Sequence, residues 1–242
     1  VKAGMFGWPL TVTVGAITGF GWKLNAWTGR TDLTEEPVPD HFDYDFWLGP
    51  APKKPYHPHR THDTFRGYWD YDGGGLGDMG QHYLDPVQFI LGKDNEAPAS
   101  VEIDADPQDD DAVGVWRRIT FTYADGCRIV LDGRSRDQVK GEIPKYIEGP
   151  KGWMGKRFES NIPDLRKKVS ELPPLEPVIT DFHESVRTRK KFALNEDNGF
   201  WSTTMINIGK IAHRLNKNLN FDSKTLTFDD EEANKLVHQP MR

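Results

Sequence analysis

The sequence predicts a single α+β domain whose open β-sheet is predominantly antiparallel and carries its helices on one face. Strand-like segments follow one another between residues 99 and 152 without a helical pattern between them, which is typical of an antiparallel sheet. Helical patterns then dominate from residue 162 to residue 215. We assign residues 1–242 to one domain, because a chain of this length can bury a sizeable core.

The first segments predict a β-hairpin followed by a long excursion. Residues 8–17 alternate in polarity and are rich in β-branched side chains, so they predict a strand, and residues 22–27 are expected to pair with it across a Thr18-Gly19 turn. Residues 28–62 are rich in proline, glycine and charge but contain aromatic anchors. Long loops of compact domains commonly carry function, so we expect this excursion to cover a site.

The middle and last thirds of the chain contain the remaining predicted elements. Residues 99–105 predict a strand, residues 113–123 and 127–131 a hairpin across Ala124-Asp-Gly126, and residues 146–152 another strand and turn. Helices are predicted at residues 162–172, 178–189 and 202–215, the last having the clearest amphipathic pattern. The single cysteine, Cys127, lies in a predicted strand, where a buried thiol is expected.

Composition excludes two classes of partner. The net charge of −6 gives no general attraction to nucleic acid or to an anionic membrane surface. The sequence contains no apolar run of the roughly 20 residues that a membrane span needs, and no signal peptide is visible. The compartment therefore stays unassigned.

The glycine-rich stretch from Asp72 to Asp85 is the segment expected to hold the chemistry. The four glycines between Asp72 and Asp78 permit positive φ and the close approach of a ligand. A helix is predicted from about Gly77, with Asp78 as its N-cap. His82 follows Asp78 by four positions, so both side chains lie on one face and could act as general base and orienting carboxylate. The alternative is that Asp78 is only a cap and His82 a packing residue.

Residues before this stretch predict a carbohydrate platform. Polar and aromatic side chains precede the glycines, and we expect them to contact the hydroxyl groups of a sugar. The predicted substrate-binding residues are Tyr56, His57, His59, Arg60, Arg66, Trp69 and Asp70. The alternative is a divalent metal held by His57, His59, His62 and His82, although their spacing fits no standard zinc motif.

Three ordered motifs resemble one protein family. They are Asp43-Tyr-Asp-Phe-Trp-Leu-Gly-Pro-Ala-Pro52, Arg66-Gly-Tyr-Trp-Asp70 and Gly74-Gly-Leu-Gly-Asp-Met-Gly-Gln-His82. Together they are similar to the C-terminal domain of the Gfo/Idh/MocA oxidoreductases, which include glucose-fructose oxidoreductase and inositol dehydrogenase. The resemblance implies that Asp78 and His82 lie in a sugar pocket beside a nicotinamide, and that homo-oligomers form through the helix-free face of the sheet.

The resemblance also implies NAD(P), yet the sequence has no place to hold it. Family members begin with a Rossmann domain, whereas here no G-x-G-x-x-G opens a helix after a strand and no Glu-Lys-Pro motif is found. We therefore expect the N-terminal dinucleotide-binding domain to be absent from these 242 residues, and this chain alone not to bind NAD(P). The expected function is that of the substrate domain of a sugar or polyol oxidoreductase. The alternatives are a stand-alone carbohydrate-active domain, such as a metal-assisted keto-sugar lyase or hydratase, and a non-catalytic sugar-binding domain.

Overall fold

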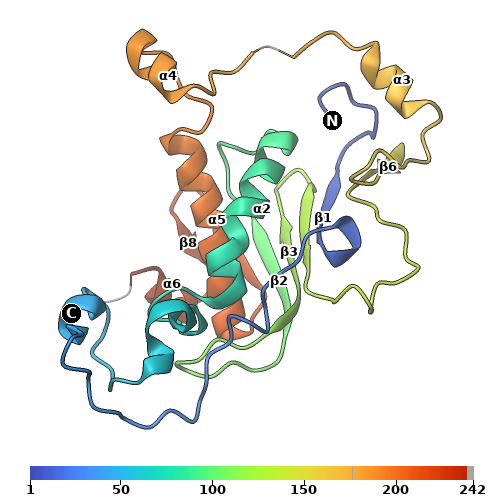
Figure 1. The fold of residues 1–242 in the computed structure, drawn as a ribbon. Helices are drawn as coiled ribbons and strands as arrows, with labels where there is room; N and C mark the ends of the chain where they lie inside the picture. The colour runs from blue at the N-terminus through green and yellow to red at the C-terminus, as the bar shows by residue number, and fades with distance from the viewer. Residues whose placement is uncertain (176, 239–242) are drawn as a thin grey trace.

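The computed structural model describes residues 1–175 and 177–238 and contains one mixed sheet with helices on one of its faces (Figure 1). Eight strands of the described chain lie in the order β6-β5-β1-β4-β3-β2-β7-β8. Their bounds are Thr11–Gly15 (β1), Ser100–Ala105 (β2), Trp116–Thr122 (β3), Arg128–Asp132 (β4), Ile147–Gly149 (β5), Gly152–Met154 (β6), Leu219–Asp222 (β7) and Thr227–Phe228 (β8). All neighbouring pairs are antiparallel except β1 and β4, so the predicted fold class is confirmed.

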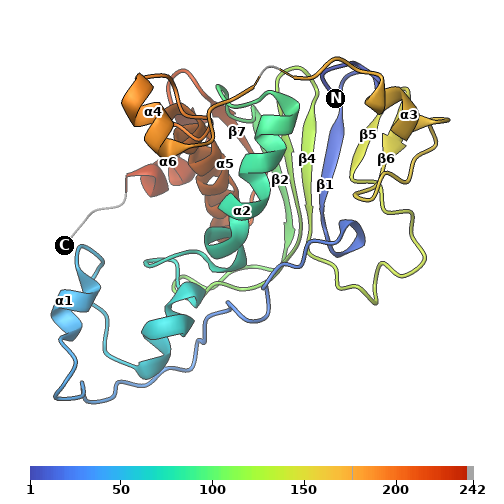
Figure 2. The ribbon, with the colours of Figure 1, turned by 45° about the horizontal axis from the view of Figure 1, so that its top comes forward.

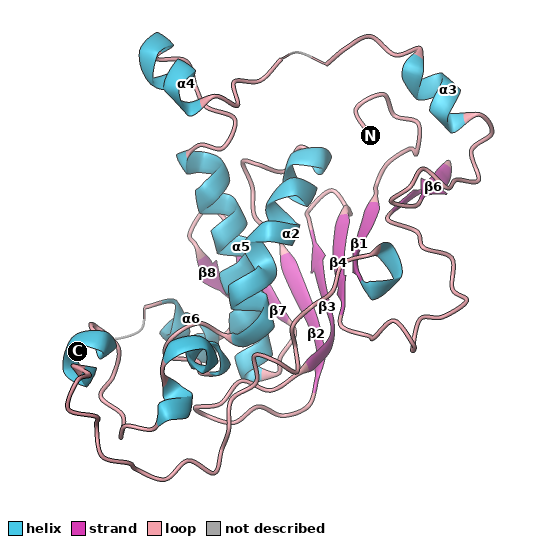
Figure 3. Cartoon of the chain, viewed as in Figure 1, coloured by secondary structure: helices cyan, strands magenta, loops and turns pink. Residues whose placement is uncertain are grey.

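Two long helices cover the sheet, and shorter ones lie around it (Figure 3). The helices are Tyr44–Leu48 (α1), Gly74–Leu91 (α2), Leu165–Ser170 (α3), Phe182–Thr188 (α4), Glu196–Leu215 (α5) and Glu231–Val237 (α6). Among the described residues, none of these helices is long and apolar enough to span a membrane.

The core lies between the sheet and the pair α2 and α5. Phe121 and Ile129 stand opposite each other on β3 and β4, and both are fully buried. Small residues bring the two helices close together and close to the sheet. A Cβ on Gly209 of α5 would lie 2.8 Å from Phe121 and 2.9 Å from Leu76 of α2, so any larger side chain would push these layers apart.

Each long helix has a terminus formed by a residue that favours this position. The Asn195 side chain accepts hydrogen bonds from the backbone N–H groups of Asp197 and Asn198 and so caps α5 at its start. Gly92 closes α2 in the left-handed conformation with φ of 69°. The predicted helix at 202–215 is confirmed and extends six residues further toward the N-terminus, to Glu196.

The predicted hairpin at the N-terminus is wrong. Residues 22–27 form no strand, because both edges of β1 are occupied: β4 pairs with it in parallel and β5 pairs with it antiparallel. The segment forms a turn instead, with Trp27 N–H donating to the Lys23 carbonyl over 3.1 Å. Leu24 is buried there in the main core.

Other predicted elements are confirmed with adjusted bounds. The hairpin of β3 and β4, the strand β2 and the short strand β5 with the turn after it lie where the sequence places them, and the Cys127 thiol is fully buried. The predicted helix at 178–189 contracts to α4, and its expected apolar face is not buried in the described chain: Phe182 is 62 % exposed and Val186 49 % exposed. The helices α1 and α6 and the strands β6, β7 and β8 have no counterpart in the sequence-based prediction.

The excursion forms a lobe beyond one end of the sheet and of the long helices (Figure 2). A small aromatic core of its own supports it, and the chain then returns to the start of α2. The lobe therefore extends away from the start of α2, and the residues packed against Gly73, Gly74 and Gly75 come from other segments rather than from a covering loop.

Candidate functional site

The glycines at the start of α2 are packed against the protein itself. Gly73 and Gly74 have φ of 107° and 73°, which the absence of a Cβ permits. A Cβ on Gly74 would lie 2.7 Å from the Val113 side chain, and one on Gly75 would lie 3.3 Å from Leu24. The glycines were expected to admit a ligand, but in this structure they admit the neighbouring turn and loop.

Asp78 lies inside α2 rather than at its cap. Gly73 occupies the N-cap position, so the predicted capping role of Asp78 is wrong. One Asp78 carboxylate oxygen accepts from Arg66 Nε over 2.5 Å, and the other accepts from Trp27 Nε1 over 2.8 Å. The Arg66 guanidinium also lies 4.9 Å from the centre of the Trp27 ring. Three segments distant in sequence are thereby joined at the first turns of α2.

Asp72 adds a second carboxylate to this cluster. Burial raises the pKa of Asp72 to about 6, and the nearby Asp78 carboxylate acts in the same direction. The cations Lys210 and Arg66 oppose this rise. No hydrogen-bond partner is found for the buried Asp72 Oδ2 within the described chain. The site therefore contains a carboxyl group whose pKa lies above the ordinary range of an aspartate.

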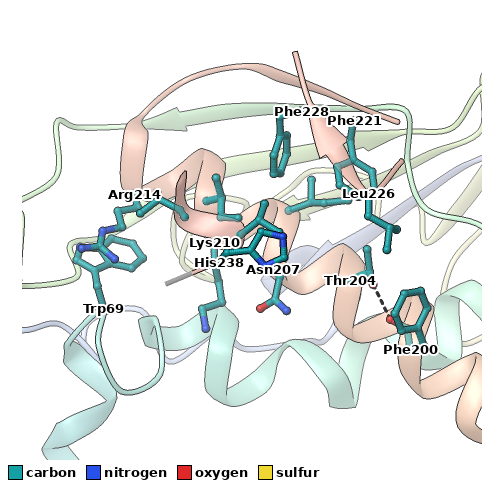
Figure 4. Close-up of a pocket in the computed structure, with 14 residues that line it drawn as sticks. Trp69, Phe200, Thr204, Asn207, Lys210, Arg214, Phe221, Leu226, Phe228 and His238 are labelled. Carbon is teal, nitrogen blue, oxygen red and sulfur yellow. Dashed lines mark hydrogen bonds between the residues drawn. The ribbon is translucent and has the colours of Figure 1, made fainter. Parts of the chain in front are cut away.

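Lys210 approaches the same turn from α5. A Cβ on Gly73 would collide with the end of the Lys210 side chain, so the amine lies directly against the start of α2. Burial lowers the pKa of Lys210, whereas the Asp72 carboxylate acts to raise it. Lys210 also lines the neighbouring pocket between α5 and α6, as Figure 4 shows.

His82 is exposed one helical turn after Asp78. Within the described chain, no hydrogen bond or ion pair joins its ring to Asp78 or to any other residue, so its nitrogens are open to an incoming group. The expected contact between the two side chains is not made in this structure, because the Asp78 oxygens are directed to Arg66 and Trp27. The arrangement leaves an exposed imidazole beside a fixed carboxylate and a guanidinium.

Of the predicted substrate-binding residues, Arg66 is the one that the described structure brings into contact with Asp78. Tyr56 is 7 % exposed and packs edge-on against Tyr44, with ring centres 5.1 Å apart. It belongs to the aromatic core of the lobe, together with Phe42 and Trp47.

The predicted histidines make separate local contacts. The His57 ring accepts from the His59 backbone N–H over 2.9 Å and lies 3.2 Å from Glu36. The His59 ring is hydrogen-bonded to the Tyr68 hydroxyl over 2.8 Å, and His62 packs against an aromatic ring. In residues 1–175 and 177–238, no group of three or more histidine, cysteine or acidic side chains is arranged to hold a metal ion. The alternative metal set with His82 is not assembled here.

Arg60, Trp69 and Asp70 connect the lobe to the loop before β3. Arg60 donates to Asp111 over 2.6 Å, and Lys54 lies 3.5 Å from Asp70 and 3.3 Å from Asp111. Trp69 Nε1 donates to a backbone carbonyl of the same loop over 3.0 Å. These contacts hold the lobe in place, and their partners are protein groups rather than open space.

Sequence reasoning missed three members of the cluster. Asp72 precedes the glycines directly, and that position was a usable signal. The sequence pattern places Trp27 in a strand, whereas its indole N–H reaches Asp78 from a turn. Lys210 carries no signal in the sequence, because its approach to Gly73 depends on how α5 packs on α2.

Comparison with known proteins agrees with this fold. The model of a family described as "Oxidoreductase family, C-terminal alpha/beta domain" matches residues 1–242. No curated protein matches the chain.

Proposed function

Because the chain belongs to the Gfo/Idh/MocA oxidoreductases and matches their C-terminal domain over residues 1–242, we propose that it is the substrate domain of a sugar or polyol dehydrogenase. In this proposal, His82 accepts the proton of the reacting hydroxyl group. The observation that supports it is the exposed, unpaired imidazole one turn after the fixed Asp78 carboxylate.

A neutral imidazole next to a carboxylate is a suitable general base. His82 would become an imidazolium on taking the hydroxyl proton, and the negative charge of Asp78 one turn away would stabilise it. Arg66 is 26 % exposed, so part of its guanidinium can donate to a neighbouring sugar hydroxyl while Nε remains on Asp78. The site thereby combines a proton acceptor with a fixed donor.

The start of α2 does not fit the phosphates of a dinucleotide. Open backbone N–H groups at a helix N-terminus are a common phosphate site, but Lys210, Val113 and Leu24 pack closely against the start of α2. The hydride acceptor, which the family implies is NAD(P), is not placed by these residues, and the proposal requires another part of the protein to hold it. Calorimetric titration of this chain with NAD⁺ and NADP⁺ is expected to show no tight binding, and micromolar affinity would contradict this assignment.

The proposal is tested in a dehydrogenase assay of this chain combined with a dinucleotide-binding domain. His82→Ala should lower kcat on a sugar or polyol by about 10²- to 10⁴-fold, with a smaller change in KM. Asp78→Asn should give a smaller loss of the same kind. His183→Ala, at an exposed histidine of α4, is the matched control and should leave kcat unchanged. A folded His82→Ala protein with full activity would refute the general-base role.

A further inference from the structure

A second concave site lies beside α5, and Lys210 lines it at the end nearest the glycine-rich stretch (Figure 4). Its volume is about 570 Å³, and its walls come from α5, from the β7–β8 hairpin and from α6. This is within the range of roughly 300–1,000 Å³ that small-molecule pockets occupy. None of the predicted site residues except Trp69 lines it.

The body of this pocket is apolar. Phe221 and Phe228 form one wall, with ring centres 5.1 Å apart in an edge-to-face arrangement. Ile208 of α5 faces them. At the rim, Phe200 is 48 % exposed and Leu226 is 39 % exposed, so the described chain leaves apolar surface uncovered here. A ligand with an apolar body would bury that surface.

The charged groups at the pocket are cationic. Lys210 and Arg214 line it at the end nearest Trp69, and no acidic side chain of the described residues does. Lys210 is directed toward the start of α2, which leaves Arg214 as the principal cation (Figure 4). Arg214 lies over the Trp69 ring at 5.8 Å and donates from Nη2 to the Asp110 backbone carbonyl over 3.2 Å. These contacts hold the guanidinium in place without neutralising its charge.

We propose that this pocket binds a small amphipathic carboxylate, with its apolar body between the Phe221–Phe228 wall and α5 and its carboxylate on Arg214. The charge complementarity selects an anion, and the planar guanidinium matches the two oxygens of a carboxylate. The apolar walls select against compact polar anions such as inorganic phosphate, because such anions would leave the apolar side chains in contact with water. This inference does not depend on the proposed dehydrogenase function.

The test uses octanoate as the probe and octan-1-ol as its neutral counterpart, with binding measured by calorimetry and by NMR shifts of the α5 amides. Octanoate should bind at least about tenfold more tightly than octan-1-ol, which corresponds to roughly 1.4 kcal/mol. Arg214→Gln should remove this difference, whereas Arg187→Gln on the exposed α4 should preserve it. Leu226→Glu, at an exposed rim position, should weaken octanoate binding at least about tenfold by placing a carboxylate at the pocket.

Three outcomes would overturn the inference. Equal binding of the acid and the alcohol would mean that the pocket is only an apolar patch. Absence of octanoate binding to the folded wild-type chain would exclude the site. Self-association that Leu226→Glu abolishes and octanoate does not affect would show that a second copy of the chain covers the pocket instead.

Discussion

Arg66 Nε lies 2.5 Å from Asp78 Oδ1, and this ion pair fastens the lobe to the first turns of α2. The two side chains are 26 % and 17 % exposed, so water screens the pair only in part. Since the guanidinium also stacks between Trp27 and Phe65, Arg66 acts through its shape as well as its charge. Substitutions of Arg66 can separate the contribution of its charge from that of its shape.

Arg66→Met should lower the free energy of unfolding by about 1–2 kcal/mol, because it leaves Asp78 with Trp27 alone. Arg66→Lys should lower the free energy of unfolding less than Arg66→Met, since lysine keeps the positive charge although it lacks the planar guanidinium. Arg30→Met is the matched control: its partner Asp32 is 71 % exposed, so the free energy of unfolding should fall less than in Arg66→Met. Urea unfolding monitored by tryptophan fluorescence gives these values. An equal decrease in the free energy of unfolding for Arg66→Met and Arg30→Met would contradict a stabilising role of the Arg66–Asp78 ion pair.

Asp72 should make stability depend on pH. Burial raises the folded-state pKa of Asp72 from its ordinary value of 3.8 to about 6, so the folded chain holds this proton more tightly than the unfolded chain. Its stabilising contribution is complete below the unfolded pKa and is lost as the pH rises through 6. As the pH rises from about 4 to about 7.5, the free energy of unfolding of Asp72→Asn should therefore increase by about 1–3 kcal/mol relative to that of the wild type.

Unfolding by urea at the two pH values measures this change, with Asp63→Asn as a control for the removal of one carboxylate at a 92 % exposed position. Lys210→Met should move the Asp72 pKa further upward, because it removes a cation that opposes the rise. NMR titration of the Asp72 carboxyl carbon reports this directly. A parallel pH dependence of Asp72→Asn and the wild type would show that Asp72 does not titrate differently on folding.

Gly77→Ala should destabilise the protein although it raises helix propensity. A Cβ at this position would lie 2.6 Å from the Asp72 backbone carbonyl oxygen, which cannot move without opening the start of α2. The expected cost is about 1–3 kcal/mol. Gly199→Ala in α5 is the matched control, since a Cβ there meets nothing within 4 Å, and it should stabilise by about 0.5–1 kcal/mol. Thermal unfolding of both variants checks the contrast, and stabilisation of both would contradict the close approach.

The sequence predicted those parts of the fold that rest on local patterns. The hairpin of β3 and β4 follows from alternation around Asp125-Gly126, and α5 follows from its apolar stripe and cap. The partner of β1 could not be predicted in this way, because β4 reaches it in parallel from more than 100 residues away. The two edges of β1 were thus filled by distant strands rather than by the segment next in sequence.

In the candidate site, too, local sequence patterns could be predicted, whereas contacts between distant segments could not. Asp78 and His82 could be found from their spacing and the glycines before them. The partners of Asp78 could not, because Trp27 and Arg66 reach it from a turn and from the lobe. Residues such as Arg60 and Tyr56 are polar or aromatic near the site in sequence, yet the lobe uses them for its own ion pairs and aromatic packing. Proximity in sequence therefore predicted more substrate-binding residues than the structure leaves free to contact a ligand.

The helix-free face of the sheet should form the contact of a homo-oligomer. Phe121 faces α5, so its neighbour Thr120 lies on the opposite face, in one row with Glu102 on β2 and with Val130 on β4. A stable dimer contact buries roughly 1,200–2,000 Å² of surface, and the long helices leave this face of the sheet uncovered. Sedimentation velocity over a wide concentration range should show a dimer. Thr120→Lys should dissociate it by burying an unpaired charge at the contact, whereas Thr203→Lys, exposed on α5, should leave it intact. A wild-type monomer, or a dimer that tolerates Thr120→Lys, would contradict this assignment of the face.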